Sequence, residues 1–187
     1  MLKYRLVPTA VRDGDFIKEM VEAISNPSSN RNKMGELKKQ IGPLTIADGQ
    51  QAMKVVRERA STWGVVPERI GMMGFSAGGE VTAGVAFEHD ANSRPNFAAP
   101  IYGGELWKDI AVPVDAPPQF IALASNDELS LQPSLALYNA WRAAGHSVEL
   151  HIYAKGGHGF GMKKQGLPSD HWIDRFGDWL QEQGFLA

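Results

Sequence analysis

Residues 74–80 read Gly74-Phe75-Ser76-Ala77-Gly78-Gly79-Glu80 and stand between a short apolar run and a run of small and apolar residues with helical spacing. The pattern indicates Ser76 as a nucleophile. A serine hydroxyl is weakly nucleophilic, so it must be exposed beside a base and near hydrogen-bond donors. A sharp turn from a strand into a helix gives that exposure. Such a turn needs small residues two positions before and after the serine, here Gly74 and Gly78.

The sequence around the motif fits such a turn. Residues 69–75 form an apolar run that predicts a buried strand, and residues 77–87 carry small and apolar residues at helical spacing. A G-x-S-x-G pattern arises by accident in a chain of this composition about one time in eight. A glycine-rich turn with a serine of no catalytic role is therefore the alternative, and partners elsewhere in the chain must decide.

Length and composition restrict the number of domains and the classes of protein to which this chain can belong. A chain of 187 residues is long enough for one domain with a sizeable core, and we expect a single domain over residues 1–187. The absence of cysteine excludes disulfides and thiolate chemistry, and a net charge of −2 offers no basic face for nucleic acid. The sequence shows neither a signal-peptide core nor an apolar run long enough to span a membrane. The default expectation is a soluble, cytoplasmic protein.

Strand-like and helix-like segments alternate along the chain. Short apolar or alternating runs predict strands over 2–6, 69–75, 97–102, 119–124 and 148–153. Helices are predicted over 45–64, 77–87 and 132–144 and near the C-terminus, and residues 22–42 are predicted to form a polar loop. The first of these helices has an apolar stripe of Gly49, Ala52, Met53, Val56, Ala60 and Trp63, and the last has one of Trp172, Phe176, Trp179 and Leu180. The pattern predicts an α/β fold with a mainly parallel sheet of about five strands flanked by helices.

Three chemically suited residues follow predicted strands. Parallel strands present their carboxyl ends at one edge of a sheet, and chemistry collects there. Ser76 follows one strand, Asp127 lies in the loop after another, and His158 lies in a glycine-rich loop after the last. The order predicts a triad in which His158 takes the Ser76 proton and Asp127 orients the imidazole. The alternatives are that Asp127 only caps a turn, that Glu128 is the acid, or that His158 is an exposed histidine without a role.

Three segments together resemble the α/β-hydrolase superfamily: residues 2–6, 71–79 and 149–161. The likeness is nearest to bacterial esterases of the acetyl-xylan-esterase and hormone-sensitive-lipase-like kind, and it extends over nearly the whole chain. It implies a carboxylic ester hydrolase that uses Ser76, Asp127 and His158 and needs no metal or organic cofactor. Looser likeness to prolyl-oligopeptidase-type peptidases leaves an amide substrate as an alternative.

The resemblance also implies where an oxyanion would bind. In the family the backbone N–H after the nucleophile, here that of Ala77, is one donor. A His-Gly-Gly-Gly-type loop supplies the second donor and precedes the strand that residues 2–6 resemble, and we expect this chain to be a shortened fold without it. Losing one donor can lower turnover by about 100- to 1,000-fold. A weakly active or non-catalytic protein is therefore an alternative to an active enzyme.

The shortened fold has a further implication for assembly. Without its usual N-terminal strands, the sheet would have an uncovered apolar edge near the nucleophile. Exposed strand edges invite pairing with another chain. We therefore expect a homodimer or a higher homo-oligomer.

Other residues near the same sheet edge are candidates for binding substrate. Glu80 stands where relatives commonly carry histidine, and it could be a surface residue or a charge that tunes the site. The pocket candidates are loop residues near the predicted catalytic edge, Tyr102, Trp107, Phe160 and Met162. The sequence as a whole predicts a serine esterase that acts on small esters, with acetyl or other short acyl groups, through an acyl-enzyme on Ser76.

Overall fold

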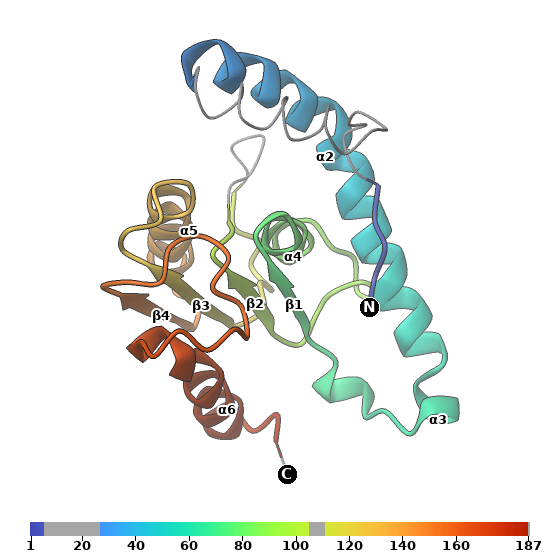
Figure 1. Cartoon of the computed structure of the whole chain (residues 1–187). Helices are drawn as coiled ribbons and strands as arrows, with labels where there is room; N and C mark the ends of the chain where they lie inside the picture. The colour runs from blue at the N-terminus through green and yellow to red at the C-terminus, as the bar shows by residue number, and fades with distance from the viewer. Residues whose placement is uncertain (6–26, 105–110, 187) are drawn as a thin grey trace.

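The computed structural model describes residues 1–5, 27–104 and 111–186. Its centre is a four-stranded parallel sheet in which the strands lie in the order β1-β2-β3-β4. The strands are β1 (Met72–Phe75), β2 (Ala98–Ile101), β3 (Gln119–Ala124) and β4 (Val148–Tyr153). The predicted parallel sheet is thereby confirmed, with four of the expected strands formed (Figure 1).

Helices cover both faces of this sheet (Figure 1). One face carries α4 (Ala77–Phe87) and α5 (Leu131–Ala143), and the other carries α6 (Trp172–Glu182). The long helix α2 (Pro27–Glu58) packs on α4, and the short segments α3 (Ala60–Trp63), η1 (Pro67–Arg69) and η2 (Pro168–His171) complete the described elements. Within the described ranges, no helix is both long and apolar enough to cross a lipid bilayer.

The main core lies around the central strand β3. All six residues of β3 are buried, as a strand covered on both faces requires. The predicted apolar face of the last helix is confirmed, because Trp172, Phe176 and Trp179 are buried against this core.

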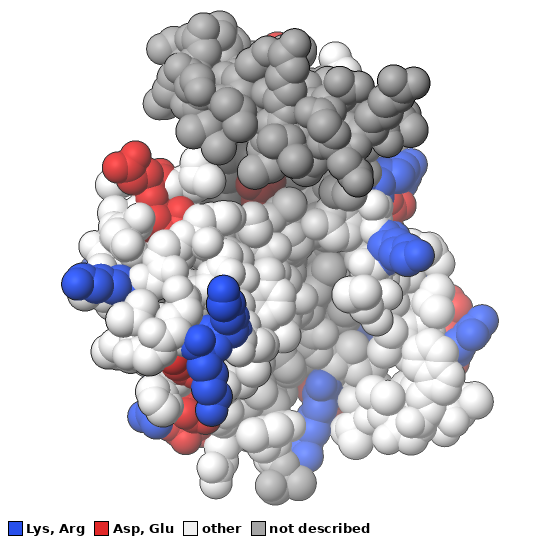
Figure 2. All heavy atoms as spheres, viewed as in Figure 1, with Lys and Arg blue, Asp and Glu red and all other residues white. Residues whose placement is uncertain are grey.

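Charged side chains of both signs are interspersed on the side of the molecule shown in Figure 2. No large patch of a single charge therefore covers that face.

The predicted loop over residues 22–42 is wrong from Pro27 onward. Residues 27–42 are the first part of α2, and Pro27 is its first residue, a position where the missing N–H costs nothing. This part of the sequence is polar and has no apolar stripe, so its periodicity gave no helical signal. The stripe itself ends earlier than expected: the helix breaks at Arg59, and Trp63 is 50% exposed with the Arg59 guanidinium over its ring.

The strand predicted over residues 2–6 is also wrong for residues 2–5, and Leu6 lies outside the described residues. The backbone N–H of Arg5 donates to the Asp48 carboxylate of α2 at 2.8 Å, and its guanidinium pairs with the same group. Tyr4 packs beside the smaller core cluster between α2 and α4. Among the described strands β1 is therefore an edge, with Met73 44% exposed, and the homo-oligomer stays a prediction.

The turn between β1 and α4 places Ser76 in an unusual backbone conformation. Its φ is 52° and its ψ is −119°, which a residue other than glycine rarely adopts. A Cβ on Gly74 would lie 2.1 Å from the carbonyl oxygen of Gly78, so strand and helix approach too closely for any side chain there. A Cβ on Gly78 would have the Tyr4 hydroxyl, at 3.8 Å, as its only close described neighbour. Of the two glycines in the motif, only Gly74 stands where a side chain would not fit.

These contacts predict opposite effects for two alanine substitutions. Gly74→Ala must push α4 away from β1, and such overpacking costs about 1–3 kcal/mol of unfolding free energy. Gly78→Ala should leave stability unchanged or raise it by up to about 1 kcal/mol, because alanine favours a helix over glycine. Chemical denaturation of both variants measures the difference. Equal losses in the two variants would contradict the turn described here.

Candidate active site

Three side chains from separate loops meet at the carboxyl edge of the sheet. Ser76 follows β1, Asp127 lies in the turn after β3, and His158 lies in the loop after β4. Ser76 Oγ is 2.7 Å from His158 Nε2, and His158 Nδ1 is 2.8 Å from Asp127 Oδ2. An ionised carboxylate only accepts hydrogen bonds, so Nδ1 carries the proton and Nε2 is free to accept from the serine hydroxyl. The structure thus brings together the three residues that the sequence analysis selected.

Asp127 is held in place by more than its histidine partner. It is 2% exposed, and Oδ1 accepts from the backbone N–H groups of Leu129 at 3.1 Å and Ser130 at 3.3 Å. Oδ2 faces His158 and also accepts from the Ser130 hydroxyl at 2.5 Å. Asp127 therefore both caps the turn, through its Oδ1 and the two backbone N–H groups, and contacts the imidazole, through its Oδ2. Glu128, the alternative acid, is exposed.

The surroundings of Asp127 favour its ionised form. Burial by itself would raise the pKa of this carboxyl group, but the hydrogen bonds from Ser130 and His158 and the charge of His158 outweigh burial. The pKa of Asp127 therefore lies below its ordinary value of 3.8. At neutral pH this carboxylate is ionised and can stabilise a positive charge on the imidazole.

The His158 loop uses its glycines to fold back over the site. Gly157, Gly159 and Gly161 have φ values of 67°, 81° and 48°, which only glycine adopts easily. The N–H of Gly157 donates to Asn126 Oδ1 at 2.9 Å, so the histidine loop is tied to the loop that carries Asp127. The sequence analysis missed Asn126, although its place directly before Asp127 was the available signal.

Tyr102, at the end of β2, lies directly beneath the histidine loop. It is the second non-glycine residue with a positive φ, 38°, among those described, and it is 5% exposed. Its ring lies edge-on to His158 at 5.3 Å and to Phe160 at 4.8 Å. Burial raises the pKa of its hydroxyl, whose oxygen accepts from the N–H of Gly161. Tyr102 thus contacts the loop at three places.

A cavity of about 160 Å³ opens beside Ser76 and His158. Its lining residues are Ser76, Glu80, Tyr102, Gly103, Gly104, Leu129, Ser130, Pro133 and His158. Of the predicted pocket residues, Tyr102 is on this wall, whereas buried Phe160 and Met162, which is 63% exposed, are not among its lining residues. Trp107 lies outside the described residues. The sequence analysis missed Leu129 and Pro133 as wall residues.

The backbone N–H of Ala77 is suited to receive an oxyanion. Ala77 is the first residue of α4, so its N–H has no acceptor within the helix and lies at the positive end of the helix dipole. Its role as a donor stays a prediction. In the part of the chain that the structure describes, no three acidic or histidine side chains are grouped to hold a metal ion.

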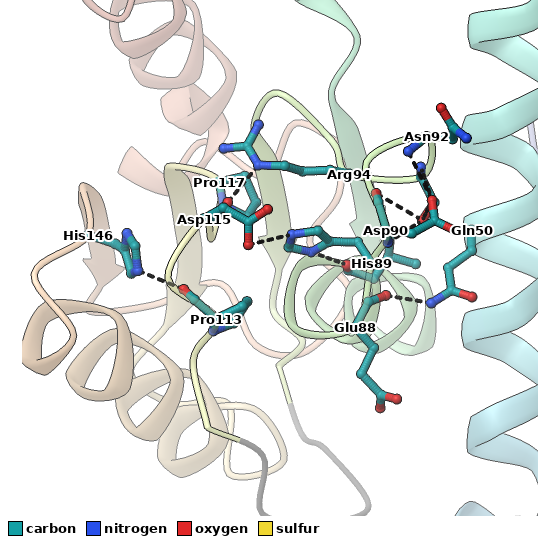
Figure 3. A network of polar contacts seen from close by, with 12 residues as sticks. Gln50, Glu88, His89, Asp90, Asn92, Arg94, Pro113, Asp115, Pro117 and His146 are labelled. Atoms are coloured by element: carbon teal, nitrogen blue, oxygen red, sulfur yellow. Dashed lines mark hydrogen bonds and ion pairs between the residues drawn. The ribbon is translucent and has the colours of Figure 1, made fainter.

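The remaining histidines are engaged elsewhere. His89 and His146 belong to a polar network at the amino ends of the strands, where they contact Asp115 and the carbonyl oxygen of Pro113 (Figure 3). His151 pairs with Glu149 on β4, and His171 pairs with Asp174. His158 is thus the histidine that the structure places beside Ser76.

Comparison with known proteins finds relatives of this chain among esterases. A curated acetylxylan esterase from Xylanibacter ruminicola is 28% identical in an alignment of 170 positions that covers 74% of this chain and 35% of that protein. The chain thus spans about a third of the length of this relative. An acetyl ester-xyloside bifunctional hydrolase from Caldicellulosiruptor lactoaceticus superposes with a TM-score of 0.69 at 24% identity, over 78% of this chain and 68% of that one. A carboxylesterase from Lactobacillus plantarum superposes with a TM-score of 0.68 at 22% identity, over 79% and 70%.

These solved structures share the α/β-hydrolase fold with this chain. The model of the dienelactone hydrolase family matches residues 13–185, which include the nucleophile turn and both loops that contact it. The chain therefore belongs to the dienelactone hydrolase family, within the α/β-hydrolase superfamily.

Proposed function

We propose that this protein is a serine carboxylesterase that hydrolyses small esters, with acetyl or other short acyl groups, through Ser76, His158 and Asp127. The observation that carries the proposal is the unbroken hydrogen-bond chain from Ser76 Oγ through the imidazole to a buried carboxylate, at the wall of a cavity. Relatives named as an acetylxylan esterase and a carboxylesterase support an ester as the substrate.

Each member of the chain has a defined task in this mechanism. Ser76 Oγ attacks the ester carbonyl carbon while His158 Nε2 takes its proton, and the Asp127 carboxylate stabilises the imidazolium. The oxyanion forms beside the N–H of Ala77. His158 then gives its proton to the departing alcohol, which leaves an acyl group on Ser76. Water, deprotonated by His158, releases the acid and restores the serine.

The cavity supports a short acyl group. Its volume of about 160 Å³ is below the range of about 300–1,000 Å³ that is common for drug-sized ligands. Leu129 and Pro133 give it apolar surface close to the serine. An acetyl group needs little more than this, whereas a long acyl chain would have to extend beyond the cavity.

Replacement of Ser76 by alanine tests the nucleophile. Ser76→Ala should reduce hydrolysis of p-nitrophenyl acetate by at least about 1,000-fold and abolish labelling by paraoxon, because the attacking oxygen is lost. Paraoxon suits this test because it phosphorylates an esterase of the same fold from Thermogutta terrifontis.

Three results would redirect the proposal. Activity that survives Ser76→Ala would refute Ser76 as nucleophile. A wild-type chain that neither turns over nor becomes labelled would indicate a non-catalytic member of the fold. Cleavage of aminoacyl p-nitroanilides at rates comparable to esters would favour a peptidase.

Replacement of Asp127 by asparagine tests the acid. Asp127→Asn should lower kcat by about 10,000-fold, because the amide no longer fixes the required tautomer or stabilises the imidazolium. Glu128→Gln is the matched control, since it removes an equal charge from the exposed neighbouring side chain. Equal effects of the two substitutions on kcat would contradict the role given to Asp127.

The lowered pKa of Asp127 also predicts how stability depends on pH. A carboxyl group whose folded pKa lies below its ordinary value stabilises the fold above pH 3.8, and this contribution is lost as the pH falls through the folded pKa. The difference in unfolding free energy between wild type and Asp127→Asn should therefore shrink on acidification below pH 3.8. Other carboxylates with lowered pKa values, such as Asp48 and Asp170, contribute equally to the unfolding free energy of both proteins, so their contributions cancel in this difference. A pH-independent difference in denaturation experiments would contradict this assignment.

A further inference from the structure

Ser130 stands directly beside the acid of the proposed triad. It is 4% exposed, and its hydroxyl donates to Asp127 Oδ2 at 2.5 Å. The same oxygen faces His158 Nδ1 at 2.8 Å. The hydroxyl and the imidazole therefore share one acceptor oxygen. The proposed esterase mechanism assigns no task to this hydroxyl.

The start of α5 does not account for the hydrogen bond of this hydroxyl. Ser130 is the N-cap residue of α5, where serine is favoured because its side-chain oxygen usually accepts a backbone N–H of the first turn. Here the side chain makes no such capping bond. The backbone begins the helix without it, since the carbonyl oxygen of Ser130 accepts from the N–H of Ser134 at 2.9 Å. The hydroxyl thus bonds to the carboxylate and not to the helix.

A second turn in this chain shows which part of the arrangement an aspartate turn uses. Asp90 and Ser93 are also three positions apart, and Asp90 Oδ1 accepts from the backbone N–H groups of Asn92 at 2.9 Å and Ser93 at 2.8 Å. The Ser93 hydroxyl bonds to this same oxygen at 2.9 Å. In the turn of Asp127 the backbone N–H groups also use Oδ1, but the Ser130 hydroxyl bonds to Oδ2. The bond on the side of the imidazole is thus not part of the pattern that the two turns share.

This bond changes the stability of the negative charge on Asp127. Burial, the largest effect, raises the pKa of the carboxyl group, and the hydrogen bond from Ser130 comes next and lowers it, followed by the bond from His158. A hydrogen bond to the charged form favours that form. Without the hydroxyl the carboxylate would be a less stabilised anion, and the imidazole beside it would take up a proton more readily.

We propose that Ser130 is a positioning residue that acts through Asp127 and sets the pH range in which His158 can serve as the base. The inference rests on the proposed esterase function, since it concerns the base of the same site. The hydroxyl stabilises the Asp127 carboxylate and so weakens the attraction of this charge for a proton on the imidazole. His158 is therefore unprotonated, and able to accept the Ser76 proton, at a lower pH than it would be without Ser130. The two backbone donors on Oδ1 do not depend on the hydroxyl.

Other ionisable side chains also lie around the imidazole. Among the described residues, Tyr102 has its ring edge-on to His158 at 5.3 Å, and burial raises the pKa of its hydroxyl. Glu80 of α4 lines the same cavity as His158. Both residues are unchanged in variants of Ser130, so a difference in pH dependence between such a variant and the wild type reports the bond to Asp127.

The pH dependence of kcat/KM for p-nitrophenyl acetate tests the proposal. Activity falls on acidification as His158 becomes protonated, and the midpoint of this acid limb is the readout. Ser130→Ala should move the midpoint upward by about 0.5–1 pH unit, which lowers kcat/KM on the acid limb by about three- to tenfold relative to wild type. Ser130→Thr keeps a hydroxyl and should retain the wild-type midpoint. A midpoint that Ser130→Ala leaves unchanged or lowers would overturn the proposal.

Ser93→Ala is the matched control. It removes a serine hydroxyl that also bonds to an aspartate three positions earlier, but this pair lies beyond the end of α4 opposite Ser76. Its midpoint should equal that of wild type, and a shift as large as that of Ser130→Ala would overturn the proposal. If circular dichroism shows that Ser130→Ala does not fold, Ser130→Gly replaces it, because glycine is tolerated at an N-cap.

An NMR titration of the His158 ring measures the same effect without catalysis. The ring signal is identified by its loss in His158→Asn. Its titration midpoint should be higher in Ser130→Ala than in wild type. The difference should vanish when both proteins also carry Asp127→Asn, because Ser130 acts through that carboxylate. A difference that persists in the Asp127→Asn background would overturn the proposal.

The two readouts separate this inference from the proposed function. Hydrolysis that is sensitive to Ser76→Ala, with no shift of either midpoint in Ser130→Ala, would overturn the role of Ser130 and keep the esterase. A shifted NMR midpoint in a chain that neither hydrolyses the ester nor is labelled by paraoxon would support the effect of Ser130 on His158 and overturn the esterase.

Discussion

The turn at Ser76 is the constraint on which the rest of the site depends. A non-glycine residue with a φ of 52° persists only where its surroundings fix it, because such a conformation costs about 1–3 kcal/mol. Here the N–H of Ser76 continues the ladder to β2 by donating to the carbonyl oxygen of Ile101 at 3.0 Å. Two residues beyond Ile101, a Cβ on Gly103 would meet the Ser76 carbonyl oxygen at 2.5 Å. Backbone at the end of β2, packed against the turn, thus holds the hydroxyl where a base can reach it.

The parallel sheet explains why the other two members come from where they do. Ser76 follows the first strand and His158 the fourth, so about 14 Å of sheet width separates the two strand ends, at about 4.8 Å for each strand spacing. The glycine-rich loop must fold back across that width, and the Asp127 loop lies between. The hydrogen bond from the Gly157 N–H to Asn126 holds the returning loop against the turn after β3, and the contact of Tyr102 with Gly161 holds it against the residues after β2.

The parts of this structure that could be predicted from sequence are those with a local cause. The apolar runs of the four strands, the small residues of the turn, and the polar residues directly after strand ends each leave a signal in a short window. The first part of α2 left no such signal, because its polar residues form no apolar stripe. Its helical form continues from the later part of α2, which packs on α4. Residues 2–5 alternate like a strand, but the backbone N–H of Arg5 bonds to Asp48, forty-three residues away, and not to a strand. Such long-range contacts are invisible in a short window.

The residues of the cavity wall also could not be predicted from short stretches of sequence. The predicted pocket residues are three aromatic residues and Met162, yet Leu129 and Pro133 line the wall and Phe160 is packed behind Tyr102. Glu80 was visible one helical turn after the nucleophile, but only the structure shows that it lines the cavity. The start of α4 leaves the Ala77 N–H without a helical acceptor and also holds the acidic residue of the first turn, Glu80, so the donor proposed for the oxyanion and the wall residue belong to the same helix end.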